Sequence, residues 1–527
     1  MILQQEWYPL AAMDAVHLER ELTSFLAEAQ NAVVVEDGAV IFDLRDARYS
    51  ISGERGRCLL HLWSDERNIV RRVLEIEQKN GCMNLTVQRF GQARPQKLEI
   101  LRDRDRRTPS ARRVARTQYQ KLLERALIRS FPDWRVENLT SAMDLERSFS
   151  PVYTRGLIRR GNAAFAVLGV NAQELQSAID GSLTFGLLWL EHCRTREAGK
   201  AVIKGLKLFL PAGCSDVVCS RLSQLNTQLA EFHLFELDER DEIVQPRDLQ
   251  DRGNIATRLV RRPDENGVRN RLAAAVSRIT ALLPECQVAV LSSSEIAFRL
   301  HGLEFARARI SVEKGSFQST EEIVFGAGSY ERLLDEDSGT LFEELVRRLR
   351  TARKPGGDSR ETLWRMYPER WLESLACQQV SRLDSRLDPN HVYVQVPAFT
   401  ASDRAMIDVL TVTSTGRLAV IELKADEDIH LPLQGLDYWG RVKWHQERGE
   451  FQQFGYFLNL ENKPLPVCSA APLLFLVAPA LHVHPAVDTV LRYFPPAIDW
   501  ELIGVDEHWR EELHVVFRKR NALTVHA

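Results

Sequence analysis

Two carboxylates and a lysine stand close together in the stretch 406–438, MIDVLTVTSTGRLAVIELKADEDIHLPLQGLDY. Turn-forming residues at 413–416 separate two apolar, β-branched runs, so 405–424 is predicted to form a β-hairpin. Asp408 and Glu422 each lie seven positions from Thr415, which places them opposite each other in an antiparallel pair. Side chains alternate along a strand, so Glu422 and Lys424 share one face. Two carboxylates and one ammonium are therefore expected at one end of a sheet.

This combination suits a hard divalent cation. Asp408 and Glu422 supply anionic oxygens, and the backbone carbonyl of Leu423 adds a neutral one, as the all-oxygen octahedral shell of Mg²⁺ (or Mn²⁺) requires. Such an ion activates water and neutralises a phosphate.

The Asp408 and Glu422-Leu423-Lys424 pattern resembles the PD-(D/E)xK, or restriction-endonuclease-like, nuclease superfamily. The similarity runs from about residue 368 to residue 506, over a predicted order of helix, three strands, helix and strand. The nearest similarity is to the C-terminal nuclease domain of mismatch-type endonucleases. The resemblance implies an α/β fold with a mixed sheet flanked by helices, and Mg²⁺-dependent hydrolysis of phosphodiester bonds in DNA rather than RNA.

The same resemblance adds three residues to the site. Glu373 in the first predicted helix is implied to complete or orient the metal shell, with Glu369 as a rival one turn earlier. Gln434 and Tyr438, one turn apart on the next helix, are implied to steady the phosphate or Lys424. The predicted metal ligands are thus Asp408, Glu422, Leu423 and Glu373, and Lys424 positions the attacking water.

Nearby polar residues are left out of this site. Asp426, Glu427 and Asp428 are interpreted as a solvated acidic loop, and His430 and His445 as polar surface.

The elements that position the site recur earlier in the chain. Arginine-rich stretches at 101–116 and 346–360, interpreted as linkers, each precede the same predicted order of helices and strands. A β-rich segment lies upstream of each. We therefore predict an internal duplication with four domains: a β-rich module at 1–105, a degenerate nuclease-like α/β domain at 111–250, a second β-rich module at 267–345 and the nuclease domain at 361–527.

The first α/β copy lacks the catalytic residues. With FAVLGVNA (165–172) laid over LAVIELKA (418–425), Arg155 stands for Asp408, Gly169 for Glu422 and Asn171 for Lys424. Gly181 and Phe185 replace Gln434 and Tyr438, and only Glu124, opposite Glu373, keeps its charge. This copy is predicted to be inactive and to serve in scaffolding or substrate binding.

Composition bounds the remaining properties of the 527-residue chain. Its 69 Lys and Arg against 72 Asp and Glu give a net charge of −3, so any nucleic-acid contact depends on local charge such as Arg261, Arg262, Arg269 and Arg271. We expect no signal peptide, no membrane span, and free cysteines in the cytoplasm. One site per chain leaves a homodimer open. The alternative function is a non-catalytic nucleic-acid-binding or regulatory protein built on nuclease-like scaffolds.

Overall fold

The computed structural model divides the chain into two compact units, residues 1–121 and 122–527. It describes residues 15–27, 32–36, 39–44, 48–53, 58–63, 68–79, 82–88, 95–101, 109–144, 146–251, 257–312, 319–326, 331–399, 406–459, 461 and 463–521. Residues 102–108 of the first arginine-rich stretch lie outside these residues, and 109–116 begin helix α2 (Pro109–Ser130) where a linker was predicted.

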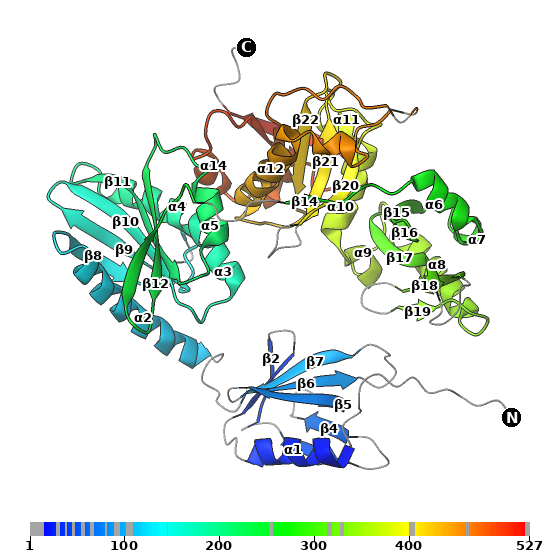
Figure 1. Cartoon of the computed structure of the whole chain (residues 1–527), viewed down its shortest axis with the longest axis horizontal. Coiled ribbons are helices and arrows are strands. Elements are labelled where there is room, and N and C mark those ends of the chain that lie inside the picture. Colours follow the sequence, from blue (N-terminus) through cyan, green and yellow to red (C-terminus); the bar gives the residue numbers. More distant parts are fainter. Residues whose placement is uncertain are drawn as a thin grey trace. The chain divides into compact units, whose positions relative to one another are not determined.

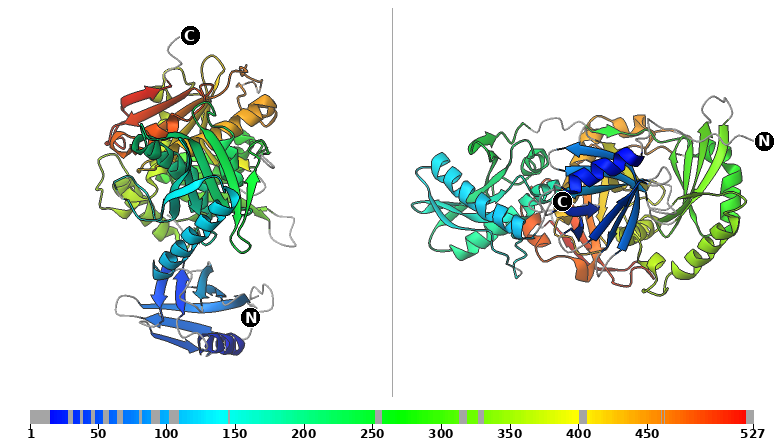
Figure 2. Two further views of the ribbon diagram at one scale, coloured as in Figure 1. Left: turned by 90° about the vertical axis from the view of Figure 1, so that its left-hand side faces the viewer. Right: turned by 90° about the horizontal axis from the view of Figure 1, so that it is seen from below.

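The first unit holds the N-terminal β-rich module. Helix α1 (Ala15–Ala27) packs across an antiparallel sheet, as Figures 1 and 2 show, and its Leu18, Leu22 and Phe25 are buried at helical spacing. The strand order is β2-β1-β7-β6-β5-β4-β3. The bounds are Val33–Glu36 (β1), Ala39–Asp43 (β2), Arg48–Ser52 (β3), Cys58–Trp63 (β4), Asn68–Lys79 (β5), Cys82–Gln88 (β6) and Gln96–Leu101 (β7).

The second unit begins with the first α/β sheet, which follows helix α2 (Pro109–Ser130) in the order β13-β12-β11-β10-β9-β8. Helices α3 (Gln176–Asp180), α4 (Ser182–Arg196) and α5 (Asp216–Leu222) also belong to it, and Figure 1 shows α4 and α5 on one face and α2 on the other. The strands are Arg135–Thr140 (β8), Tyr153–Arg160 (β9), Ala163–Val170 (β10), Val202–Pro211 (β11), Glu231–Asp238 (β12) and Ile243–Arg247 (β13).

The second β-rich module has its own core. Strands β15 to β19 form an antiparallel sheet in sequence order, packed by helices α6 (Glu265–Arg271), α7 (Ala273–Leu282) and α8 (Gly339–Ala352). The strands are Gln287–Ser292 (β15), Glu295–Leu300 (β16), Leu303–Val312 (β17), Ser319–Phe325 (β18) and Arg332–Leu333 (β19).

The last sheet has the order β14-β20-β21-β22-β23-β24-β25. Its strands are Arg258–Leu259 (β14), Tyr393–Phe399 (β20), Met406–Val412 (β21), Leu418–Leu423 (β22), Leu473–Pro479 (β23), Trp500–Val505 (β24) and Val515–Arg520 (β25). Its helices are α9 (Thr362–Arg365), α10 (Pro368–Gln378), α11 (Val380–Leu383), α12 (Leu431–Glu447), α13 (Glu450–Gln453) and α14 (Val487–Leu491), with a short 3₁₀ turn η2 (Ala480–His482).

The two α/β sheets share one topology. From β8 to β13, neighbouring strands run antiparallel, antiparallel, parallel, parallel and antiparallel. Strands β20 to β25 repeat these directions in the same order. The predicted order of elements is therefore present twice, and strands β13 and β25 extend both sheets beyond what the sequence patterns indicated.

The helices of the two sheets pack on each other reciprocally. Helix α4 of the first sheet contacts α14 of the second, and α12 of the second contacts α5 of the first. Their apolar side chains form one continuous core. The two α/β modules are thus packed as a pair within one compact unit.

The second predicted linker differs from the structure. Helix α8 extends through residues 346–352, so this stretch begins as helix. Arg353 follows it fully buried and donates to the carbonyls of Leu300, His301, Leu363 and Met366. Because one guanidinium binds four carbonyls, the β-rich module is held against α9, and this segment is not a flexible linker.

Candidate active site

Asp408 and Glu422 lie where two strands of the second sheet separate. Strands β21 and β22 pair from Val412–Leu418 to Val409–Ile421, and the next pair in this register is Asp408 with Glu422. Instead of continuing the ladder, the N–H of Leu423 donates to Asp408 Oδ2 over 3.3 Å. The N–H and C=O of one strand residue point the same way, so the Leu423 carbonyl faces the Asp408 side.

Lys424 is held between two carboxylates. Its Nζ donates to Glu422 Oε1 over 2.9 Å and lies 3.9 Å from Glu369 Oε1. Burial by itself lowers the pKa of Lys424, but the charges of Glu422 and Glu369 outweigh it, and the pKa is raised. The ammonium therefore keeps its charge at neutral pH.

Glu373 reaches the same site from helix α10. Its side chain is buried and accepts from Arg370 over 3.0 Å and from Gln395 Nε2. The same Gln395 nitrogen donates to Asp408 Oδ1 over 3.2 Å. Gln395 thus joins the helix carboxylate to the strand carboxylate.

Gln395 was not predicted from the sequence. It lies in β20 with φ 50°, at the position opposite Asp408, between the pairs Val394–Val409 and Val396–Ile407. A positive φ is uncommon for a residue other than glycine, and such residues cluster at active sites. The available signal was a polar residue within the apolar run YVQVPAF.

Gln434 and Tyr438 occupy one face of α12 toward the sheet. Gly435, next to Gln434, lies so close that a Cβ there would stand 3.7 Å from the Cβ of Glu422. The Gln434 Oε1 atom is buried and has no hydrogen-bond partner among the described residues. Burial, with the charges of Glu422 and Asp408, raises the pKa of Tyr438, so its phenol remains protonated.

Two carboxyl groups of the site favour their protonated forms. Burial raises the pKa of Glu422 well above its usual range, and the charge of Asp408 raises it further against the opposing charge of Lys424. Burial raises the pKa of Glu373 to about 7, although Arg370 opposes this. Both shifts arise first from burial, and the charge of Asp408 adds to each.

An open pocket of about 270 Å³ gives access to Glu373 and Asp408. Glu373, Asp408, Leu423, Tyr367, Glu369, Arg370 and Asp426 are among its lining residues. Within the described part of the chain, no group of three or more His, Cys, Asp and Glu side chains has the arrangement of a metal site. The Glu422 Oε2 atom, however, is buried with no hydrogen-bond partner in those residues, so the donor set fits an added cation.

The residues left out of the site lie around it. Asp426 and Glu427 are exposed, as expected of a solvated loop. The histidines differ from the expected polar surface, because His445 is fully buried between Thr257 and Glu450, and His430 Nδ1 lies 2.9 Å from Thr184 Oγ1 on α4. Both histidines join elements together, and His430 is half-buried.

The first sheet aligns with the second differently from the sequence overlay. Ala166 and Leu168 face α4 and the shared core, as Leu418 and Val420 face α12, whereas Phe165 contacts Trp134 on the other face. Aligning Phe165 with Leu418 therefore assigns every side chain of the strand to the wrong face, because a shift of one residue exchanges the two faces of a strand.

Helix packing fixes the correct alignment. A Cβ on Gly186 of α4 would meet Leu206 and Leu208, and one on Gly435 of α12 would meet Leu474 and Leu476. Leu208 pairs with Leu168 and Leu476 pairs with Glu422. The residue at the Glu422 position is thus Leu168 and not Gly169, and Val170 replaces Asn171 at the Lys424 position.

The other positions follow from this alignment. Arg155 pairs with Leu168 and keeps the predicted place of Asp408. Counted from the two glycines, Phe185 stands at Gln434 and Trp189 at Tyr438, which corrects the assignment of Gly181 and Phe185. Glu124 is exposed on α2, unlike the buried Glu373. The carboxylate pair has no counterpart in the first sheet.

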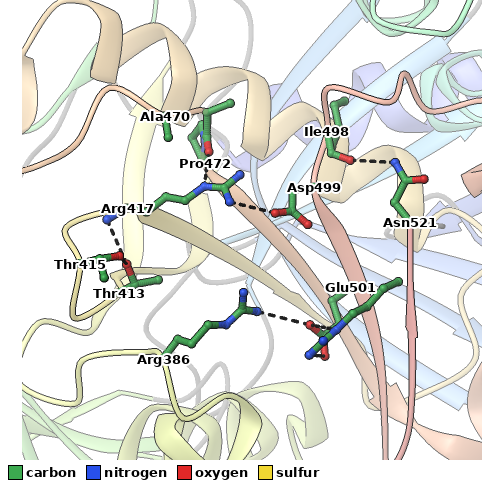
Figure 3. Close-up of polar contacts among 12 residues, drawn as sticks. Arg386, Thr413, Thr415, Arg417, Ala470, Pro472, Ile498, Asp499, Glu501 and Asn521 are labelled. Atoms are coloured by element: carbon green, nitrogen blue, oxygen red, sulfur yellow. Dashed lines mark hydrogen bonds and ion pairs between the residues drawn. The ribbon is translucent and has the colours of Figure 1, made fainter. Parts of the chain in front are cut away.

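The end of the second sheet opposite Glu422 is closed by ion pairs (Figure 3). Arg417 binds Asp499 and the carbonyl of Ala471, and the buried Glu501 binds Arg518 and Arg520, with Arg386 3.5 Å away. These contacts give each of those charged groups a partner. Of the carboxylates just named, Glu422 is the one with a buried oxygen that lacks a hydrogen-bond partner in the described part of the chain.

The arginines expected to track a nucleic-acid backbone are held by the fold. Arg269 and Arg271 donate to the carbonyls of Val288 and Ser293, and Arg262 pairs with Glu265. Arg261 lies over the ring of Phe454, 5.7 Å from its centroid.

No protein-family model matches the chain, and no curated protein matches it. None of the described helices is long and apolar enough to cross a membrane.

Proposed function

We propose that the protein is a metal-dependent endonuclease of the PD-(D/E)xK type, with one active site in its C-terminal α/β module. The observation that carries this proposal is the group of Asp408, Glu422 and Lys424 at separating strands, where Glu422 keeps a buried oxygen without a partner. Lys424 compensates one oxygen of Glu422, and the other, near the charge of Asp408, is costly to bury unless a cation joins it.

Asp408, Glu422, the carbonyl of Leu423 and Glu373 would hold Mg²⁺ or Mn²⁺. Bound there, the ion would supply Lewis acidity toward a phosphodiester and its attacking water. Hard oxygen donors of this kind favour these ions over zinc or copper.

Lys424 supplies the fixed positive charge of the site. Glu422 and Glu369 restrain its ammonium, which can donate to the attacking water and to a phosphate oxygen whose negative charge grows during the reaction. Its raised pKa suits a group that stays charged throughout.

Gln395 and Tyr438 act on the site by positioning. Through its two hydrogen bonds, Gln395 fixes the distance between the Glu373 and Asp408 carboxyl groups. The protonated phenol of Tyr438 and the amide of Gln434 present uncharged polar groups on the α12 side, where a phosphate can be bound without added repulsion.

We further propose that the two α/β modules arose by duplication and that the first is an inactive partner. Their common strand directions and the reciprocal packing of α4 on α14 and α12 on α5 support this, because a two-fold interface uses the same surface from both sides. The chain then carries an internal dimer with one active half, which cuts one strand per encounter.

The test is cleavage of single- and double-stranded DNA and RNA by the purified chain with Mg²⁺, Mn²⁺ or EDTA. Asp408→Asn is expected to lower the cleavage rate by about 10²–10³-fold. Glu124→Gln, which removes an exposed acidic charge from α2, is the matched control and should leave the rate unchanged.

Cleavage that persists in EDTA or in Asp408→Asn would contradict the mechanism. Binding of nucleic acid with no cleavage under any metal would favour the non-catalytic scaffold instead.

A further inference from the structure

A second open pocket, of about 520 Å³, lies in the first α/β module. Strand β8 contributes Asn138 and Thr140, and helix α4 with the turn after it contributes Trp189, Arg196, Glu197 and Lys200. Asn138 has φ 54° in a bulge of β8, and Gln395 has φ 50° in the equivalent strand β20, where the register is unbroken. The pocket therefore adjoins the strand that corresponds to the one that carries Gln395.

Positive charge gathers around this pocket. The guanidinium carbons of Arg155 and Arg196 lie over the ring of Trp189, 5.6 and 5.5 Å from its centroid. Arg155 is 3% exposed and its Nε is buried with no hydrogen-bond partner among the described residues. The Nη2 of the lining residue Arg196 is buried and unpartnered in the same sense.

The acidic lining residue is already neutralised. Glu197 accepts from Arg159 over 2.6 Å and from Arg196 over 3.0 Å, so each of its oxygens has a guanidinium partner. Lys200, which is exposed at the pocket, has no acidic partner in the described chain. Among the residues described, the pocket thus has a lysine charge without an anionic partner and a guanidinium N–H without a hydrogen-bond acceptor.

We propose that this pocket binds a phosphate group. Guanidinium forks and a lysine ammonium are the donors that recognise phosphate, and buried N–H groups without partners are costly unless a ligand accepts from them. The volume is that of a site for a small ligand or for one segment of a strand. The phosphate belongs either to a nucleic-acid backbone or to a free nucleotide, which share this chemistry.

The inference does not depend on the proposed cleavage, because binding uses none of Asp408, Glu422 and Lys424. The experiment measures binding of a fluorescein-labelled oligonucleotide and of a fluorescent ATP analogue to the full chain in EDTA, by anisotropy at several salt concentrations. Lys200→Met is the main variant, since its side chain makes no internal ion pair and its loss leaves the fold intact. Lys204→Met, an exposed lysine of β11 outside the pocket lining, is the matched control.

Lys200→Met is expected to weaken binding about fivefold and to reduce its salt dependence, while Lys204→Met leaves both unchanged. If affinity falls for the oligonucleotide alone, the pocket binds a backbone phosphate. If affinity falls for the ATP analogue, the pocket is a nucleotide site. Arg196→Met is the second variant, with thermal unfolding as its check on folding.

Unchanged affinity for both probes in Lys200→Met and in folded Arg196→Met would overturn the proposal. A chain that binds but does not cut would refute the nuclease assignment alone, and one that cuts with unchanged affinity in both variants would refute the phosphate pocket alone.

Discussion

The two α/β sheets of the second unit have the same strand order and directions but opposite chemistry at equivalent positions. Where the second sheet has Asp408 and Glu422, the first has Arg155 and Leu168. Tyr438 is matched by Trp189, whose ring lies beneath the Arg155 guanidinium. The same backbone thus holds a crowded acidic group in one module and a basic, aromatic one in the other.

The comparison shows that topology does not decide which charge a sheet end carries. Arg155 and Asp408 occupy equivalent positions in the two sheets, and the residue types there then determine the ligand. Acidic oxygens select a cation and guanidinium groups select an anion. In the functions proposed above, the second module binds the cation and the first binds the phosphate.

The largest effect should come from Lys207, which stands in the first sheet where Phe475 stands in the second. Its ammonium is 6% exposed and lies 4.4 to 5.3 Å from the ring centroids of Phe165, Phe131 and Phe235. Burial lowers the pKa of Lys207 from 10.5 to about 8.

Between pH 8 and pH 10.5 the unfolded chain therefore keeps a proton that the folded chain has released, and the free energy of unfolding rises with pH in this window. The rise from this group is ~3 kcal/mol. The Lys207→Met variant should show no such rise in the free energy of unfolding, and at pH 7 it should be more stable than the unaltered chain. Urea unfolding at each pH measures both. A pH dependence equal to that of the unaltered chain would show that Lys207 is solvated, and Lys204→Met serves as the control.

A smaller effect is expected at the contact between the two modules. Arg221 of α5 forms a two-pronged ion pair with Asp437 of α12, with nitrogen–oxygen distances of 3.0 and 2.7 Å. Arg221→Met should lower the free energy of unfolding by ~2 kcal/mol, since Asp437 is left partly buried without its partner. A double-mutant cycle with Asp437→Asn checks this, and additive losses would mean that the pair contributes no coupling.

The smallest effect concerns Gln395, which connects Glu373 to Asp408. Gln395→Ala should lower the cleavage rate about tenfold with little change in KM, because it loosens catalytic groups without removing one. Gln245→Ala, at an exposed position of β13 in the first sheet, should change neither. A rise in KM alone would indicate that Gln395 contacts the substrate.

Much of the second sheet could be predicted from its sequence. The hairpin register follows from the turn at 413–416 and from the alternation of apolar residues, so Asp408 and Glu422 lie in one register as expected. Helix α10, strands β20 to β22, helix α12 and strand β23 also follow in the predicted order, because each buries an apolar pattern of its own period.

The alignment of the first module failed by one residue for a physical reason. Apart from Glu422, Lys424 and Asn171, the segments FAVLGVNA and LAVIELKA are apolar, since strands covered on both faces show no alternation. Such sequences do not reveal which side chains face which helix. The packing of Gly186 and Gly435 against pairs of leucines resolved it.

The sequence by itself determined the element order, the hairpin and the types of residue that meet at its open end, because these depend on local turns and periodicity. Tertiary structure alone decided that Gln395 bridges two carboxylates, that Glu422 keeps an unpartnered oxygen, and that Arg155 and Arg196 surround Trp189. Those features arise between segments far apart in the chain, where burial and neighbouring charge are set only once the segments pack.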